Sequence, residues 1–327
     1  MRSLLFVGWL VATCLLRVAA QTPAPIAVHD PVLIRQDSTY YVFATGRGIR
    51  VWSSPDRQHW KAEKPVFETA PAWTTQANPG TRPNDFWAPD ISYHNGLYYL
   101  YYSSSVFGKN SSAIGLATNQ TLHPTDPNYR WVDRGLVVQS VPGRDNWNAI
   151  DPNLIVDSTG RGWLTFGSFW EGIKLVRLND SLTAPSQPST WYTLASRPRT
   201  DSTSLQHAGN GAIEAPFLFR KRGFYYLFVS VDYCCRGAKS TYKVWVGRST
   251  ALTGPYLDQS GKPMTRGGGT MVLQGDANWH GVGHNAVCTF DNTDYLIYHG
   301  YDAADKGKSK LLIRELRWDA AGWPVVK

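Results

Sequence analysis

Ala149–Ile150–Asp151–Pro152–Asn153–Leu154–Ile155 places an acidic residue directly before a short apolar segment, and this arrangement decides the fold. Four other points of the chain repeat it, so an ionisable residue precedes an apolar run every 60 to 70 residues. The five ionisable residues are Asp30, Asp90, Asp151, Glu214 and His284. The chain is therefore predicted to contain five copies of one structural unit.

Each unit contains short segments rich in Tyr, Val and Ile, bounded by Gly, Pro, Asp and Ser, which is typical of strands and hairpins. In the second unit these segments are 90–93, 97–102, 113–117 and a strand opening at 129–132. Amphipathic stretches of helical length are nearly absent. Four short strands repeated five times predict an all-β fold, a five-bladed β-propeller. The outer strand of the last blade is expected from residues 318–326 or, alternatively, from residues 21–28.

The first twenty residues have the pattern of a secretory signal peptide. Arg2 is followed by an apolar run from Leu4 to Leu16 and by small residues at Val18–Ala20. This run is too short to span a membrane, and no later segment is long and apolar enough to do so. We expect a signal peptide at 1–20, one catalytic domain at 21–327, and secretion to the extracellular space or periplasm.

Charge and cysteine content exclude some classes of function. The formal net charge is +8, but no Lys/Arg-rich run is present, which argues against nucleic-acid binding. After signal removal three cysteines remain, too few for a disulfide framework. The adjacent Cys234 and Cys235 form either a vicinal disulfide or two buried thiols. Cys288 is expected to be a buried thiol.

Carboxylic acids at equivalent points of five blades would meet around one axis. Crowding them in a partly desolvated site raises some of their pKa values. Such a site suits glycosidic bond hydrolysis, in which one carboxylic acid protonates the leaving oxygen and one carboxylate activates water. The alternative for each acid is a strand-entry residue bonded to backbone amides, and it is strongest for Asp90.

His284 has three possible roles. It could bind a cation on the axis, stack against a sugar, or cap a strand. No His-x-His or His-Glu-x-x-His spacing for zinc is present. A weakly held and mostly hydrated calcium or sodium ion is compatible with one His and nearby carboxylates.

A set of ordered motifs resembles glycoside hydrolase family 43, and most closely its endo-1,5-α-L-arabinanases. The resemblance runs from His29 to about Leu316. The motifs that carry it are His29–Asp30–Pro31, Phe86–Trp87–Ala88–Pro89–Asp90, Trp147–Asn148–Ala149–Ile150–Asp151–Pro152, Gly167–Ser168–Phe169–Trp170, Gly211–Ala212–Ile213–Glu214–Ala215–Pro216, Asp232–Tyr233–Cys234–Cys235–Arg236–Gly237 and Gly281–Val282–Gly283–His284–Asn285.

The resemblance implies an inverting mechanism. Asp30 would be the general base, Glu214 the general acid, and Asp151 the residue that tunes the pKa of Glu214 and orients it. His284 would face a bound calcium or sodium ion. The implied substrate contacts are Asp30, Trp87, Phe107, Gly108, Asn148, Ala149, Ile150, Asp151, Ser168, Phe169 and Trp170.

The implied substrate is linear arabinan, cleaved internally by a monomeric enzyme. An exo-acting α-L-arabinofuranosidase or β-xylosidase of the same family is an alternative, because the sequence does not show whether the cleft is open at both ends. A catalytically silent carbohydrate-binding propeller is a second alternative, which the intact Asp30, Asp151 and Glu214 disfavour.

Overall fold

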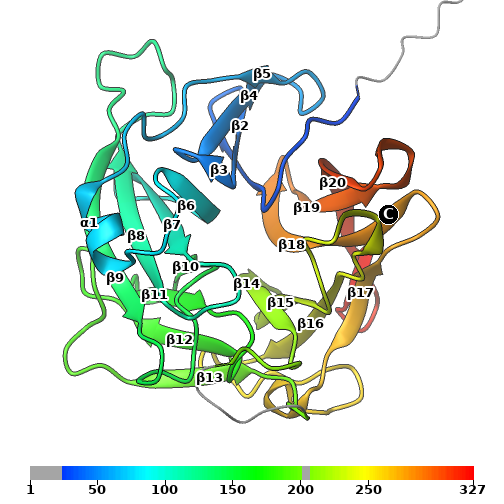
Figure 1. Cartoon of the computed structure of the whole chain (residues 1–327). Helices are drawn as coiled ribbons and strands as arrows, with labels where there is room; N and C mark the ends of the chain where they lie inside the picture. Colours follow the sequence, from blue (N-terminus) through cyan, green and yellow to red (C-terminus); the bar gives the residue numbers. More distant parts are fainter. Residues whose placement is uncertain (1–23, 201–206) are drawn as a thin grey trace, which may run out of the picture.

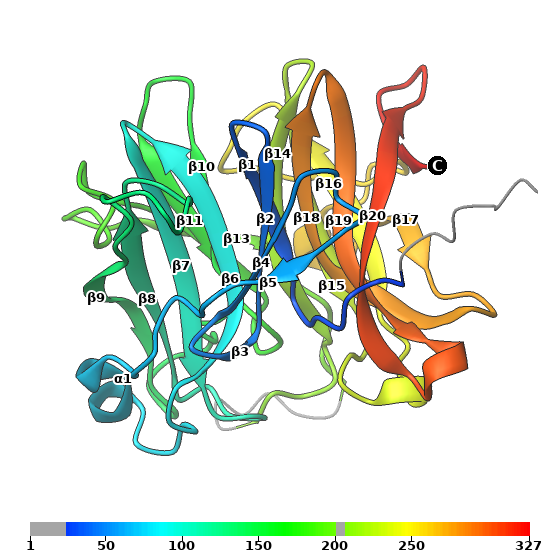
Figure 2. The same ribbon diagram turned by 90° about the horizontal axis from the view of Figure 1, so that it is seen from above.

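The computed structural model describes residues 24–200 and 207–327, so the predicted signal peptide lies outside the described residues. The regular structure in these ranges is almost entirely β-strand, arranged in five sheets around a common axis (Figure 1). The described helices are the six-residue α1 (Ala72–Ala77) and three single 3-10 turns, Gly237–Lys239, Met264–Arg266 and Ala303–Asp305. Figure 2 shows the ring edge-on, with α1 at one end. No helix in these ranges has the length and apolar character needed to cross a membrane.

The first two blades follow the predicted hairpin pattern. Blade 1 consists of β1 (Val32–Gln36), β2 (Thr39–Ala44), β4 (Arg50–Ser54) and β5 (Lys61–Ala62). Blade 2 consists of β6 (Asp85–His94), β7 (Leu97–Ser105), β8 (Ser112–Asn119) and β9 (Val132–Ser140), and β3 (Gly46–Arg47) joins its inner edge. Through β3, the chain of blade 1 hydrogen-bonds directly to blade 2.

The other three blades each contain four strands in chain order. Blade 3 consists of β10 (Asn153–Val156), β11 (Gly162–Phe166), β12 (Ile173–Arg177) and β13 (Trp191–Ala195). Blade 4 consists of β14 (Ile213–Lys221), β15 (Phe224–Val231), β16 (Lys243–Ser249) and β17 (Thr270–Gln274). Blade 5 consists of β18 (Trp279–Phe290), β19 (Thr293–Asp302), β20 (Lys308–Trp318) and β21 (Pro324–Val326). The five-bladed β-propeller predicted from the repeat is confirmed.

The ring closes by packing between blades 5 and 1. β21 pairs with β20, which confirms that the C-terminal segment supplies the outer strand of blade 5. Residues 24–28 form no strand, so the alternative closure by 21–28 finds no support there; Ile26 only accepts one backbone hydrogen bond, from Leu311 at 2.9 Å. Apolar residues of blades 1, 2 and 5 share one buried cluster, which holds the two chain ends of the ring together.

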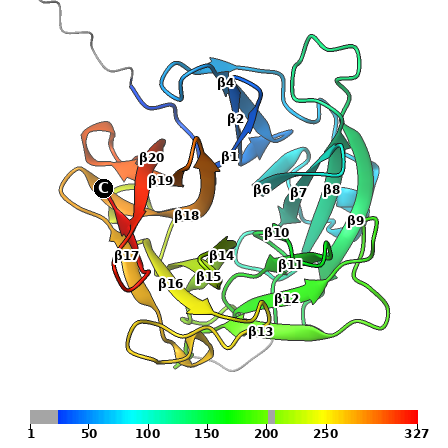
Figure 3. The same ribbon diagram turned by 180° about the vertical axis from the view of Figure 1, so that it is seen from behind.

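The inner strands β1, β6, β10, β14 and β18 lie nearest the axis, as Figures 1 and 3 show from opposite faces. On each inner strand, or two residues before it begins, one residue has a left-handed backbone with φ between 45° and 58°, and these residues are Asp30, Ala88, Asp151, Ala215 and His284. Such a conformation is uncommon outside glycine. The true repeat is therefore centred on this residue. The predicted register was wrong by two residues at Asp90 and by one at Glu214.

A ring of hydrogen bonds connects these five left-handed residues. The backbone N–H of each donates to a side chain of the preceding blade. The pairs are Ala88 N to Thr45 Oγ1 (2.8 Å), Asp151 N to Ser103 Oγ (3.1 Å), Ala215 N to Asp151 Oδ2 (3.0 Å), His284 N to Ser230 Oγ (2.8 Å) and Asp30 N to His299 Nδ1 (3.1 Å). Each acceptor satisfies a backbone donor that would otherwise be unpaired beside the axis.

Blade 3 departs from this pattern. In the other blades the acceptor stands opposite the residue that precedes the left-handed residue, but in blade 3 this position, opposite Ile150, is Gly167. A Cβ on Gly167 would lie 2.6 Å from the carbonyl oxygen of Gly172, and its φ is 132°, so a side chain is excluded there. The carboxylate of Asp151 takes its place and holds the N–H of Ala215, the residue after Glu214. Asp151 therefore fixes the backbone that carries Glu214.

Asp90 serves the fold rather than the axial site. Its Oδ2 accepts the N–H of Leu154 at 2.9 Å, and its Oδ1 accepts Nδ2 of Asn153 at 3.2 Å. Asn153 accepts the N–H of Leu218 at 2.8 Å. It occupies the same position in blade 3 as Asp90 does in blade 2, two residues after the left-handed residue. The expectation that Asp90 joins the other acids at the axis was wrong, because it stands two residues further along its strand. The strand-entry alternative describes it.

We predict that Asp90→Ala lowers the free energy of unfolding by about 1–3 kcal/mol, because a buried backbone N–H of Leu154 loses its acceptor. Asp90→Asn should cost less, since its amide oxygen still accepts that N–H, although its NH2 then faces the NH2 of Asn153. Urea unfolding of both variants at constant pH measures the difference. Equal losses for the two variants would contradict the inter-blade role of Asp90.

Candidate active site

Three carboxyl groups and two imidazoles, His29 and His284, line one cavity of about 490 Å³ on the propeller axis. Asp30, Asp151, Glu214 and His284 all line it. Each stands at or beside the left-handed residue of its blade, so the hydrogen-bond ring places them together. The convergence predicted from the repeat is confirmed for these four residues.

Most of the predicted substrate contacts also line this cavity. They are Trp87, Phe107, Gly108, Asn148, Ile150, Ser168, Phe169 and Trp170. Ala149 is the exception. Its side chain is fully buried in an apolar cluster, and its N–H donates to Ser140 Oγ at 2.9 Å. The prediction that Ala149 contacts substrate is therefore not supported.

Asp30 is surrounded by positive and donor groups. Its Oδ1 lies 2.8 Å from His29 Nδ1 and 3.0 Å from His284 Nδ1, and its Oδ2 accepts the hydroxyl of Thr45. Burial alone would raise the pKa of Asp30, but the two imidazoles outweigh burial and hold it well below its ordinary value. Asp30 is thus ionised across the neutral and mildly acidic range.

Glu214 lies between two hydroxyl groups. Its Oε2 accepts Ser168 Oγ at 2.8 Å and its Oε1 accepts Tyr242 Oη at 2.7 Å. Burial, together with the charge of Glu214, raises the pKa of Tyr242 well above its ordinary value, so Tyr242 remains a donor. The two hydroxyls fix the direction of the Glu214 carboxyl group within the cavity.

Asp151 is the neighbour whose protonation is most perturbed. Burial, with repulsion from Glu214 and Asp30, raises the pKa of Asp151 from its ordinary value of 3.8 to about 8, although His284 and the N–H of Ala215 oppose the rise. Asp151 therefore retains its proton at neutral pH. The site combines one ionised carboxylate, Asp30, with one protonated carboxyl group, Asp151, beside Glu214.

The imidazole of His284 lies close to these acids and carries positive charge that offsets theirs. Burial would lower its pKa, but Asp30, Asp151 and Glu214 raise it to about 9. Its Nδ1 faces Asp30, and among residues 24–200 and 207–327 no partner is found for its Nε2. A second cluster of His29, Asp30 and His299 has ligand-type atoms within 4.8 Å of one another. Both nitrogens of His29 and Nδ1 of His299 are already hydrogen-bonded, so this cluster is a hydrogen-bond network.

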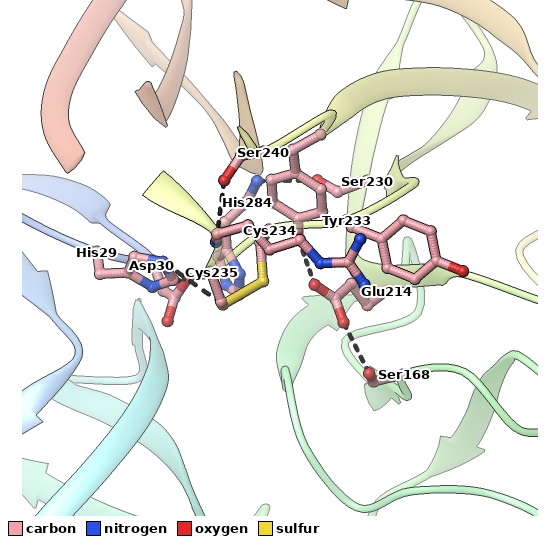
Figure 4. Close-up of a disulfide and its surroundings, with 12 residues drawn as sticks. His29, Asp30, Ser168, Glu214, Ser230, Tyr233, Cys234, Cys235, Ser240 and His284 are labelled. Atoms are coloured by element: carbon pink, nitrogen blue, oxygen red, sulfur yellow. Dashed lines mark hydrogen bonds and ion pairs between the residues drawn. A yellow bond between two sulfur atoms is a disulfide. The ribbon is translucent and has the colours of Figure 1, made fainter. Parts of the chain in front are cut away.

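Cys234 and Cys235 form a vicinal disulfide that lines the same cavity, which resolves the alternative left open by the sequence. In the view of Figure 4 it lies between His29 and Asp30 on one side and Glu214 and Ser168 on the other. Cys288 is a half-buried free thiol that packs against the core, and burial raises its pKa.

Several functional neighbours were missed by the sequence prediction. Tyr242 occupies no repeated position, so no pattern marks it. Thr45 stands at the acceptor position of the hydrogen-bond ring, which the sequence does not reveal because a different residue type fills it in most blades. Tyr233 stands inside the Asp-Tyr-Cys-Cys motif, but nothing in that motif marks its side chain. His29 stands inside the His-Asp-Pro motif, and its contact with Asp30 could have been suspected from adjacency alone. His299 and Tyr301 contact His29 only because the ring brings blade 5 against blade 1.

A propeller with an axial cleft, exposed aromatic side chains and carboxyl groups of opposite protonation defines a carbohydrate-cleaving hydrolase. Comparison with protein families agrees. The model of glycosyl hydrolases family 43 matches residues 23–324. The chain belongs to this family and is a glycoside hydrolase.

Relatives with known names act on arabinan. The chain is 49% identical to an extracellular exo-α-(1→5)-L-arabinofuranosidase of Cellvibrio japonicus, over 98% of this chain and 92% of that one. It is 45% identical to an extracellular endo-α-(1→5)-L-arabinanase of Bacillus subtilis, over 91% and 87%. The structure of a Cellvibrio cellulosa α-L-arabinanase complexed with arabinohexaose superimposes with a TM-score of 0.91, at 49% identity, covering 93% of this chain and 96% of that chain.

We predict that Asp151→Asn is more stable than the wild type at pH 8 and that this advantage shrinks as the pH falls to 4. A carboxyl group with a raised pKa contributes stability that is present below its ordinary pKa and is lost as pH rises through its folded pKa, here about 8. Asparagine does not titrate, and its oxygen can still accept the N–H of Ala215.

Urea unfolding of both proteins between pH 4 and 9 measures this difference. Each unit of pKa shift corresponds to about 1.4 kcal/mol, so the change across the range should be well resolved. A variant that is less stable than the wild type at every pH would contradict the crowding of charge at Asp151.

Proposed function

We propose that this protein hydrolyses internal α-1,5-L-arabinofuranosidic bonds of linear arabinan with inversion of configuration. The observation that carries the proposal is the contrast in one cavity between Asp30, held ionised, and Asp151, which retains a proton beside Glu214. An inverting glycosidase needs one group of each kind. Similarity to proteins named for α-1,5-arabinan supports the choice of substrate.

Glu214 is proposed as the general acid. The hydroxyls of Ser168 and Tyr242 hold its carboxyl group, and hydroxyl groups can donate or accept, so both protonation states can be accommodated. During bond cleavage Glu214 gives its proton to the leaving glycosidic oxygen. Tyr242 and Ser168 then donate to the carboxylate that remains.

Asp30 is proposed as the general base. It stands on blade 1, whereas Glu214 stands on blade 4, so the two approach the cavity from different blades. Ionised Asp30 takes a proton from the attacking water, whose oxygen forms the new bond to the anomeric carbon as the leaving oxygen departs with the proton of Glu214. His29 and His284 occupy Oδ1 of Asp30, and Oδ2 has the Thr45 hydroxyl as its hydrogen-bond partner.

Asp151 is proposed to keep the acid proton available and to aim Glu214. Burial and repulsion from Glu214 raise the pKa of Asp151, so a proton is held beside Glu214 at neutral pH. Through the N–H of Ala215, Asp151 also fixes the backbone next to Glu214. Its effect on the reaction is exerted through Glu214.

The aromatic and backbone groups around the acids are proposed to hold the sugar rings. Phe107 is 76% exposed on the cavity wall, which is unusual for so large an apolar side chain and suits stacking against a sugar. Trp87, Asn148 and Ser168 to Trp170 lie around the same cavity.

Exo action is the second candidate. The specific observation in its favour is the 49% identity to an exo-α-(1→5)-L-arabinofuranosidase, slightly above the 45% to an endo-arabinanase. A non-catalytic propeller is set aside by membership of the glycoside hydrolase family and by the three carboxyl groups in the cavity.

We predict that debranched arabinan gives a mixture of oligosaccharides from the first minutes of incubation. Size analysis of early products measures this, and arabinose or a single short product from the start would identify the exo mode.

Glu214→Gln should lower kcat by roughly 10²–10⁴-fold, because general acid catalysis contributes about this much. Near-wild-type turnover in that variant would contradict the acid assignment.

We also propose a calcium or sodium ion beside His284. With Nδ1 donating to Asp30, Nε2 can act as a ligand, which is the usual arrangement of a metal-binding histidine. One imidazole with the remaining positions hydrated suits a weakly held hard cation. When bound, the ion supplies positive charge close to the carboxyl groups.

For this ion we predict that protein exchanged into buffer without calcium or sodium melts at a lower temperature, and that adding either ion restores the melting temperature. The effect should weaken as pH falls, because protons compete for the imidazole. His284→Gln should remove the dependence on cation. Unchanged melting and unchanged activity on cation removal would contradict the proposal.

Secretion is proposed from two observations. The sequence begins with a signal-like segment at 1–20, and the two relatives most relevant to function are named extracellular. Arabinan is a polymer outside the cell, which agrees with this location. The monomeric state remains a prediction.

A further inference from the structure

His29 joins the proposed general base to a residue of blade 5. Its Nδ1 lies 2.8 Å from Oδ1 of Asp30, and its Nε2 lies 2.8 Å from the hydroxyl of Tyr301. The Tyr301 hydroxyl in turn accepts the backbone N–H of Cys235 at 2.7 Å. A continuous chain of hydrogen bonds therefore runs from the vicinal disulfide segment to Asp30.

The chemistry of the end groups sets the direction of this chain. A carboxylate only accepts, so Nδ1 of His29 must carry the proton that faces Asp30. His284 Nδ1 lies 3.0 Å from the same oxygen and likewise donates to it. In the Nδ1–H tautomer, His29 presents the lone pair of Nε2, and the hydroxyl of Tyr301 donates to it. At the other end, the N–H of Cys235 can only donate to Tyr301.

The surroundings hold each member in place. The ring of His29 stacks on His299 with centroids 4.1 Å apart, and His299 itself accepts the N–H of Asp30. Tyr301 is buried, and burial raises its pKa well above its ordinary value, so its hydroxyl remains a donor. Cys235 has a left-handed φ of 65°, and its sulfur lies 3.9 Å from Nε2 of His29. Figure 4 shows this sulfur beside His29 and Asp30.

We propose that Tyr301 is a positioning residue for the general base: its hydroxyl holds His29 in the Nδ1–H tautomer, and His29 in turn fixes Oδ1 of Asp30. This inference rests on the proposed function of Asp30. With Oδ1 engaged by two imidazoles, Oδ2 is the oxygen directed to the attacking water. The vicinal disulfide segment supplies the backbone donor that completes the chain.

The test is nitrogen NMR of protein labelled with ¹⁵N-histidine, without substrate, at neutral pH. His29 is assigned by comparison with the spectrum of His29→Gln. The expected wild-type signature is a protonated Nδ1 and an Nε2 that accepts a hydrogen bond. In Tyr301→Phe the Nε2 loses its donor, so its hydrogen-bonded signature should change to that of a free lone pair or of an imidazolium.

Kinetics supply the second readout. Tyr301→Phe should lower kcat roughly three- to tenfold, the range expected for one lost hydrogen bond, with KM unchanged. Tyr256→Phe is the matched control, because it removes a buried hydroxyl that donates to the Leu252 carbonyl in blade 4, away from the cavity. It should leave both the His29 signature and kcat unchanged.

The proposal is overturned if wild-type His29 is the Nε2–H tautomer or an imidazolium, a result that needs no variant to fold. It is also overturned if folded Tyr301→Phe keeps the wild-type signature and kcat. The tautomer of His29 is measured without substrate, so a failure of this proposal can be told apart from a failure of the proposed arabinanase function. The latter would leave arabinan intact.

Discussion

Five inter-blade hydrogen bonds around the axis are the constraint on which the site depends. Each inner strand contains or closely follows a left-handed residue whose N–H must find a partner, and the preceding blade supplies it. Two of the left-handed residues, Asp30 and Asp151, carry the acids, and Glu214 stands beside a third. The contacts that close the ring therefore also position the reactive groups. In this propeller, the same hydrogen bonds hold neighbouring blades together and set the geometry of the catalytic groups.

The ring also explains why the acids differ. The carboxyl group of Asp151 accepts the ring hydrogen bond from Ala215 because there is no room for a side chain at Gly167. Asp151 therefore lies buried beside Glu214. Its pKa rises as a result. Asp30 faces His284 of blade 5 and its own chain neighbour His29, and its pKa falls. Opposite protonation thus follows from the groups that each acid faces, at the cost of charge crowding that a purely structural channel would avoid.

The fold could be predicted from the sequence because the unit repeats five times and its strands are punctuated by Gly, Pro and Asp. The register could be predicted less well. Matching on acidity aligned Asp90 and Glu214 with Asp30, whereas the shared feature is a left-handed residue, which is Ala88 or Ala215 in those blades. Residues that reach the site from other strands, such as Tyr242 and Tyr301, were not predictable, because only tertiary packing brings them to Glu214 and His29.

The central claim is that Asp30 and Glu214 act from different blades on one glycosidic bond, as base and acid, with water entering directly. The anomeric form of the first reducing end measures this most directly, by proton NMR of a linear α-1,5-arabino-oligosaccharide during the earliest turnovers. The account predicts that the β-anomer forms first and that the α-anomer follows by mutarotation. An α-anomer formed first would contradict it.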